Sequence, residues 1–448
     1  GLAAPVGLLF YESEGRIRRF PRTARYRWRA YEIERTGGGV SSSTRLLADK
    51  PAVIERLRFE RAGVYHLVFG GLPRTWSFTS YWNLPSEDVP MFNVSHCERG
   101  LRLEDTKTFG AAEFALPGEI SVHADLLAWL EGEPALERGK IGVTKLTVRA
   151  GEEITWCGVQ GCEEELATVE PEVDWRLARL RWEELWQAAF QPENGLFSGH
   201  LPLVRGEFER LYGMSVLTLL MCRRKVPTRT RRSQIATGGQ CIWNSSAANG
   251  MQHVYVWGGP EGGMTTLFLW ELEFQAPMLA RLDPAILRAE LEAMIRVDLH
   301  AHWGFESVSG AGAGMGYGVN AGAFLSAVRD YVRITGDRGW ALERLDFLKS
   351  CARPEFTDYG SYENILECVK GYEHGVAAFQ ALAVQGLRFL AELTQDRQYT
   401  RAANLLSRRV LELYAGGPFA CLQADGSKRV VQTVLDFVTA LESGEVSL

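Results

Sequence analysis

The hydrophobic pattern of this chain changes its period near Asp174. Before that residue, short runs such as 64–69, 119–124 and 141–148 are rich in β-branched and aromatic residues and end close to glycines. Such runs predict strands. After it, apolar residues beginning at Trp175 recur at helical spacing, and Asp174 is the expected N-cap of the first helix. The chain therefore has to build a β-rich part followed by a helical part.

The two periods divide the chain into three expected parts. Many short strands punctuated by Gly and Pro predict an N-terminal β-sandwich over residues 1–165. A linker helix is expected within 166–200, and a helical domain over 201–448. Helices are expected in this last domain, with almost no strand signal, over roughly 206–223, 264–281, 284–299, 320–335, 338–350, 371–394, 398–414 and 429–442.

A short repeat organises the expected helices into pairs. Residues 335–338 (Thr-Gly-Asp-Arg) and 394–397 (Thr-Gln-Asp-Arg) each end one apolar helix and begin another. Each is expected to form the tight corner of an αα-hairpin, and stacked hairpins that close into a ring form an α/α toroid. A six-hairpin ring needs more helices than the pattern supplies, so we expect a ring that is incomplete, irregular or cut off at Leu448.

Composition excludes several classes of protein. The 448 residues are 46% hydrophobic and 23% charged, with a net charge of −6. No apolar run is long enough to span a bilayer, and the acidic balance gives no pull toward nucleic acid. Eight scattered cysteines favour a reducing, cytoplasmic location, although the chain opens at Gly1 without methionine, as a processed or truncated N-terminus does. Metal-ligand and phosphate-loop spacings are missing, so we predict neither metal nor cofactor.

The segment 269–274 combines two carboxylates with two aromatic rings. Such a combination can hold a sugar ring and protonate a glycosidic oxygen. On a helix, however, Glu271 and Glu273 lie about 200° apart around the axis, so they cannot face one cavity as an acid/base pair. Trp270, Glu273 and Phe274 share one face. The segment thus offers at most one catalytic carboxylate; alternatively, it is a core helix whose glutamates form ion pairs.

Two further segments carry polar groups suited to ligand recognition. Residues 302–320 are too rich in glycine for a helix or a central strand, and long loops inside compact domains are usually functional. The side chains expected to line a polar pocket there are Trp303, Glu306, Tyr317 and Asn320. The alternative is a flexible surface loop.

The third segment, 359–374, places tyrosines, amides and carboxylates ahead of a long apolar helix, an arrangement suited to binding hydroxyl groups. From it we expect Glu363 and Tyr372 to contact a ligand. The basic run 223–232 has no interleaved aromatic residues, so we expect a solvated surface or arginines in an anionic pocket rather than a nucleic-acid site.

The order of these features resembles a known clan. A β-sandwich, a linker helix and an α/α ring that carries a Trp-acid-x-x-Phe element are similar to the inverting glycoside hydrolases around trehalase, the processing α-glucosidases and mannosylglycerate hydrolase. The matching residues are Trp270, Glu271 and Phe274, and later Tyr317 and Asn320 with the Thr-Gly-Asp of 335–337. The resemblance covers about residues 200–440.

The resemblance implies an inverting hydrolase of a carbohydrate substrate. It places the general acid at Glu271, where the clan has an aspartate, and makes Trp270, Trp303 and Tyr317 stacking platforms for sugar rings. The clan's base is a late glutamate for which no match occurs before Leu448. Two alternatives remain. A disaccharide phosphorylase would use Arg229, Arg231 and Arg232 to hold phosphate, and a non-catalytic carbohydrate-binding protein would need no base.

Overall fold

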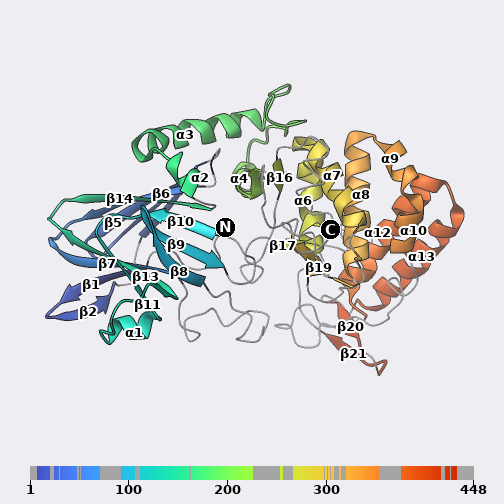
Figure 1. Cartoon of the computed structure of the whole chain (residues 1–448). Coiled ribbons are helices and arrows are strands. Elements are labelled where there is room, and N and C mark those ends of the chain that lie inside the picture. Colours follow the sequence, from blue (N-terminus) through green and yellow to red (C-terminus); the bar gives the residue numbers. More distant parts are fainter. Residues whose placement is uncertain are drawn as a thin grey trace. The chain divides into compact units, whose positions relative to one another are not determined.

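The computed structural model describes two compact units, one ending at Gln187 (the β unit) and one beginning at Ala188 (the helical unit) (Figure 1). The residues described are 8–20, 25–29, 31–47, 50, 52–70, 92–105, 111–160, 163–225, 253–255, 266–296, 298–299, 301–302, 304–306, 312–313, 319–352, 375–414, 419–423 and 425–430. Within them, no helix has the length and hydrophobicity needed to cross a membrane.

The β unit consists of two antiparallel sheets. The smaller has the order β11-β13-β7-β1-β2, with bounds Glu119–His123, Ile141–Val148, Gly63–Gly70, Leu8–Ser13 and Arg16–Arg19. The larger has the order β12-β8-β9-β10-β14-β6-β5-β4-β3, with bounds Arg138–Gly139, Phe92–Cys97, Gly100–Asp105, Ala111–Ala115, Glu153–Gln160, Ala52–Phe59, Val40–Leu46, Glu32–Gly37 and Arg25–Arg29. The strands predicted around 64–69, 119–124 and 141–148 are confirmed.

One hydrophobic core joins the two sheets face to face. Phe69 of the smaller sheet packs edge-on against Trp156 of the larger, with ring centroids 5.4 Å apart, and lies 5.2 Å from Phe114. Gly142 permits the close approach, because a Cβ there would lie 2.3 Å from the side chain of Leu101 on the opposite sheet. The unit is therefore a sandwich of two sheets.

Helices cover the outer side of the larger sheet. The short α2 (Glu163–Ala167) and the long α3 (Pro171–Ala188) pack on it, and α1 (Leu126–Leu130) lies in the β11–β12 connection. The prediction that Asp174 is an N-cap is wrong, since α3 already begins at Pro171. Asp174 lies in the first turn, where its carboxylate accepts the backbone N–H of Glu170 at 2.9 Å and pairs with Lys50 at 2.7 Å.

The helical unit contains the helices α4, α6, α7, α8, α9, α10, α12 and α13, with bounds Glu209–Cys222, Leu269–Leu282, Pro284–Ile295, Val319–Thr335, Arg338–Glu343, Leu345–Cys351, Ala377–Thr394 and Arg397–Glu412. The prediction that this half has almost no strands is wrong in detail. Short antiparallel pairs form between β15 and β16, along β17-β18-β19, and between β20 and β21, with bounds Arg223–Lys225, His253–Tyr255, Thr266–Phe268, Gly304–Glu306, Gly312–Ala313, Ala420–Leu422 and Lys428–Val430.

These strands correct two predicted helices. The helix predicted from 264 begins only at Leu269, because β17 takes up 266–268 as an extended segment paired with β18. The helix predicted over 429–442 cannot begin at its first residues, because β21 runs through Val430. The remainder of that range lies outside the described residues.

The two predicted helical corners are confirmed, and they are built alike. At each corner a threonine hydroxyl donates to the carbonyl four residues earlier at 2.7 Å and accepts a backbone N–H two residues later at 3.2 Å. The residue directly after each threonine has a left-handed backbone conformation: Gly336 has φ +77° and Gln395 has φ +61°. The aspartates Asp337 and Asp396 then cap α9 and α13. Asp337 also accepts a hydrogen bond from Arg288 of α7 at 3.1 Å, which brings the start of α7 to the end of α8.

Candidate active site

The helices α6, α8 and α12 begin at the same end of the helical unit (Figure 1). Trp270 in the first turn of α6 lies edge-on to Phe379 in the first turn of α12, with ring centroids 5.8 Å apart. α8 and α12 run parallel, because Gly322 near the start of α8 lies against Leu382 near the start of α12. α6 shares their direction, since its end leads into the start of α7 beside the end of α8. The residues predicted to carry the chemistry on 269–274 thus lie where helices, not loops, hold them.

Glu271 occupies the first turn of α6, and its side chain is exposed to solvent. Burial by the surrounding protein raises the pKa of its carboxyl, and a hydrogen bond from its own backbone N–H opposes that rise. A carboxyl that water reaches and that nevertheless binds its proton more tightly than usual is suited to donating that proton.

Glu273 lies in a different environment from Glu271, as helical geometry requires. Its side chain is only 6% exposed and faces the interior of the helical unit. Burial does not favour the direct contact with substrate that we predict for this residue. Trp270 is half-buried and its ring lies 6.2 Å from that of Phe274, which is 54% exposed, so this pair presents an aromatic surface at the start of α6.

Asn320 lies in the first turn of α8 and is completely buried. Its amide donates to the carbonyl of Leu299 at 3.0 Å and to that of His302 at 2.6 Å. We predict a contact with substrate for this residue, whereas the described role of its amide nitrogen is to hold the backbone between α7 and the glycine-rich segment.

Within the glycine-rich segment, the described residues 304–306 lie beside the strand that precedes α6. In the three-stranded sheet Glu306 pairs with Thr266 and Gly304 pairs with Phe268. The backbone of Glu306 therefore lies opposite Thr266, which precedes the first residue of α6 by three positions. Sequence reasoning missed this pairing because each strand is only three residues long.

Several residues named from the sequence cannot be placed. The side chain of Glu306 and the whole of Trp303, Tyr317, Glu363 and Tyr372 lie outside the described residues, as do Arg229, Arg231 and Arg232. Their roles stay predictions.

Sequence reasoning also missed a buried polar cluster at the other end of α6. Asp283 accepts the hydroxyl of Ser198 at 2.8 Å, and fully buried Glu290 accepts the backbone N–H of Tyr255 at 2.7 Å. Burial raises the pKa of Asp283 and holds that of Glu290 well above its usual range. The length of α6 separates this cluster from Glu271 by about 20 Å along the helix, so we assign it to stability rather than to the candidate site.

Comparison with known proteins gives matches in structure alone. Neither a family model nor a curated protein sequence matches the chain. Among solved structures it is similar to a family GH92 alpha-mannosidase from Bacteroides thetaiotaomicron (12% identity, TM-score 0.47, covering 91% of this chain and 55% of the other) and to another GH92 glycosyl hydrolase (13%, 0.44, 89% and 52%). It is also similar to a rhamnosidase from Klebsiella oxytoca solved with rhamnose bound (12%, 0.43, 99% and 75%). The chain thus spans about half the length of the two GH92 structures.

Proposed function

We propose that this protein is a glycoside hydrolase that acts on an oligosaccharide or glycoside, with Glu271 as its general acid. The observation that carries the proposal is the state of Glu271: a solvent-accessible carboxyl with a raised pKa, on the first turn of the helix that also carries the Trp270–Phe274 ring pair. A general acid has to be protonated at the working pH and has to reach the leaving oxygen. The raised pKa of Glu271 favours the first requirement, and its exposure to solvent is compatible with the second.

The proposed reaction is hydrolysis with inversion. Glu271 donates its proton to the glycosidic oxygen as the bond to the anomeric carbon breaks. A carboxylate on the other side of the sugar, about 6.5–9.5 Å away, removes a proton from the water that attacks that carbon. Because Glu273 is buried on another side of α6, we expect the base to come from a different segment.

The aromatic side chains have a separate task in this proposal. The ring of Trp270, together with Trp303 and Tyr317, would stack on the apolar faces of sugar rings and orient the bond to be cleaved. The reaction needs no cofactor. We propose residues 201–448 as the catalytic domain and an α/α toroid, of which the described α6–α13 hairpins would form part, as its architecture.

The decisive test is the substitution Glu271→Gln. Glutamine keeps the size of the side chain and its place at the helix start but has no proton to give, so we expect hydrolysis to fall by at least about a thousandfold with little change in melting temperature. The matched control is Glu343→Gln, which neutralises an exposed carboxylate on α9 and should leave the rate unchanged. Release of reducing sugar from a panel of aryl glycosides gives the rates, and an active Glu271→Gln variant contradicts the assignment.

The pH profile and the products separate the remaining readings. Because the acid works only when protonated, activity should be lost as the pH rises through the raised pKa of Glu271. Magnetic resonance of the first product should show the inverted anomer. Release of a sugar 1-phosphate that depends on added phosphate would instead identify a phosphorylase, and tight binding without turnover would identify a binding protein.

A further inference from the structure

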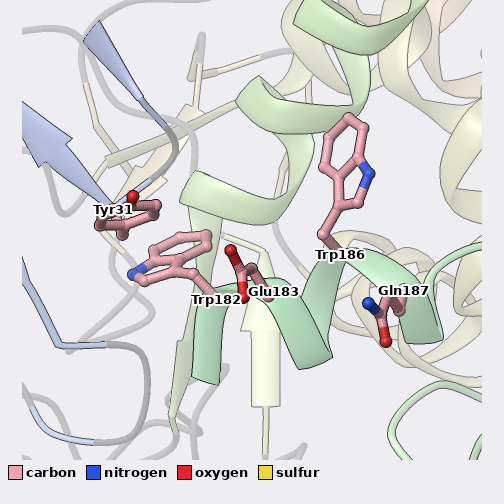
Figure 2. A pocket seen from close by; sticks show the side chains of 5 residues that line it. All are labelled: Tyr31, Trp182, Glu183, Trp186 and Gln187. Carbon is pink, nitrogen blue, oxygen red and sulfur yellow. The ribbon is translucent and has the colours of Figure 1, made fainter. Parts of the chain in front are cut away.

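A hollow on the β unit is lined by three aromatic side chains, Tyr31, Trp182 and Trp186, together with Glu183 and Gln187 (Figure 2). Its volume is about 130 Å³, and it is partly open to solvent. Four of the five residues lie on α3, as two neighbouring pairs one helical turn apart, and Tyr31 lies between β3 and β4. The proposed reaction uses none of them.

The walls of the hollow are held in place by other contacts. The indole N–H of Trp182 donates to the carbonyl of Leu46 at 3.0 Å, and the ring is only 5% exposed. The guanidinium of Arg45 lies 5.4 Å from the centre of the Tyr31 ring. Because these rings are fixed before any ligand arrives, binding costs little conformational entropy on the side of the protein.

The polar groups at the hollow are also oriented. The Glu183 carboxylate accepts a hydrogen bond from the Nε of Arg179, one turn earlier on α3, at 2.8 Å. In Figure 2 this carboxylate rises from α3 between the rings of Trp182 and Trp186. Glu183 offers acceptors, and the carboxamide of Gln187 offers both a donor and an acceptor.

The lining selects a particular class of ligand. Its described members are flat aromatic rings and two hydrogen-bonding side chains, with no aliphatic side chain among them. A ligand that matches has an apolar, flat face edged with hydroxyl groups, which describes a pyranose ring. A hollow of about 130 Å³ can take one small ring at a time, whereas a stable protein interface needs about 1,200 Å² or more of buried surface.

We propose that this hollow is a non-catalytic binding site for a neutral oligosaccharide. Sugar rings stack on Tyr31 and Trp186, the two partly exposed rings, and Glu183 and Gln187 accept and donate hydrogen bonds at the ring hydroxyls. Binding here requires no catalytic carboxylate, so the proposal stands whether or not Glu271 cleaves glycosides. A second attachment point would raise the effective concentration of a long substrate near the chain.

The test is a titration of the whole chain with maltotetraose, cellotetraose and mannotetraose, followed by tryptophan fluorescence and by calorimetry. We expect at least one of them to bind with a dissociation constant on the order of millimolar. Trp186→Ala should weaken that binding about tenfold. Trp28→Ala is the matched control, because Trp28 is 65% exposed on β3 and does not line the hollow; it should bind as the unchanged chain does.

Two further variants remove the remaining ambiguities. Glu271→Gln should keep the binding, so a failure of the proposed hydrolysis and a failure of this site give different results. Glu183→Ala alters only a half-exposed side chain, and it should weaken binding several-fold even where Trp186→Ala disturbs folding. The proposal is overturned if none of the three sugars binds, or if binding survives both Trp186→Ala and Glu183→Ala.

Discussion

The two units of the molecule treat buried carboxyl groups in opposite ways. In the β unit each of Glu32, Glu55, Glu113 and Asp174 is at most 5% exposed, and each pairs with an arginine or lysine at hydrogen-bonding distance. In the helical unit Glu290 accepts its hydrogen bond from a backbone N–H, and Asp283 accepts from a serine, although the charge of Arg223 also acts on Asp283.

The difference in neighbours decides the charge. Burial pushes the pKa of Glu32 up, but hydrogen bonds from Ser43 and Arg45 and the nearby charges of Arg45 and Arg29 outweigh it, so the pKa is lowered. For Glu290 burial dominates and the pKa is raised well above its usual range. The pKa of a buried glutamate is thus lowered in one unit and raised in the other. Glu271 follows the second pattern, which is the one a general acid needs.

The largest effect on stability is expected from Glu32→Ala. The substitution removes the carboxylate that Arg29 and Arg45 share, so Arg45 loses this anion while Arg29 keeps Glu34, and removing one partner of a buried pair costs about 3 kcal/mol. Urea denaturation measures the loss. The control is Glu14→Ala, because the pair of Glu14 with Arg18 is exposed and should be worth at most about 1 kcal/mol. Equal losses of unfolding free energy in Glu32→Ala and Glu14→Ala would show that burial does not strengthen these ion pairs.

The next-largest effect is expected from Glu290→Gln, as a change in how the free energy of unfolding depends on pH. The folded protein keeps a proton on Glu290 that the unfolded chain releases near pH 4–5, so this group's contribution to stability is complete below that range and is lost as the pH rises toward the raised pKa. The loss is about 1.4 kcal/mol per pH unit within that window. Glutamine has no proton to lose, so the variant should lose less stability than the unchanged chain as the pH rises above about 5.

Denaturant unfolding at a series of pH values upward from about 5 checks this prediction. The control is Thr394→Ser at the end of α12, which changes no ionisable group and should leave the titration of Glu290 intact. Parallel pH profiles for Glu290→Gln and the unchanged chain would mean that Glu290 is ionised when folded, and the contrast between the two units would fail.

Local rules account for what the sequence predicted well. The corners at 335–338 and 394–397 depend on residues within one turn of each other, so their threonine and aspartate hydrogen bonds could be anticipated. The separation of Glu271 from Glu273 follows from the helical repeat alone.

Long-range contacts account for what it missed. The start of α6 was misplaced because β17 pairs with a strand 38 residues away. The pattern predicts Asp174 as a cap, whereas its carboxylate pairs with Lys50, which is 124 residues distant. Asn320 has the polar side chain of a ligand-binding residue, and only its three-dimensional surroundings show that the amide holds two carbonyls. Short-range patterns identify elements; they do not identify which polar groups face inward.

The smallest effect is expected from Glu392→Gln on the surface of the helical unit. Glu392 accepts two hydrogen bonds from Arg333, at 2.7 and 2.9 Å, yet both side chains are more than half exposed. Solvent screens such a pair, so the loss should stay below about 1 kcal/mol and shrink further in about 1 M salt. Urea denaturation at low and high salt measures it, with Arg333→Gln and the double variant completing the cycle. A loss as large as that expected for Glu32→Ala, and unchanged by salt, would mean that geometry, rather than burial, sets the strength of these ion pairs. A small, screened coupling would instead attribute the difference between the two units to what surrounds each carboxyl.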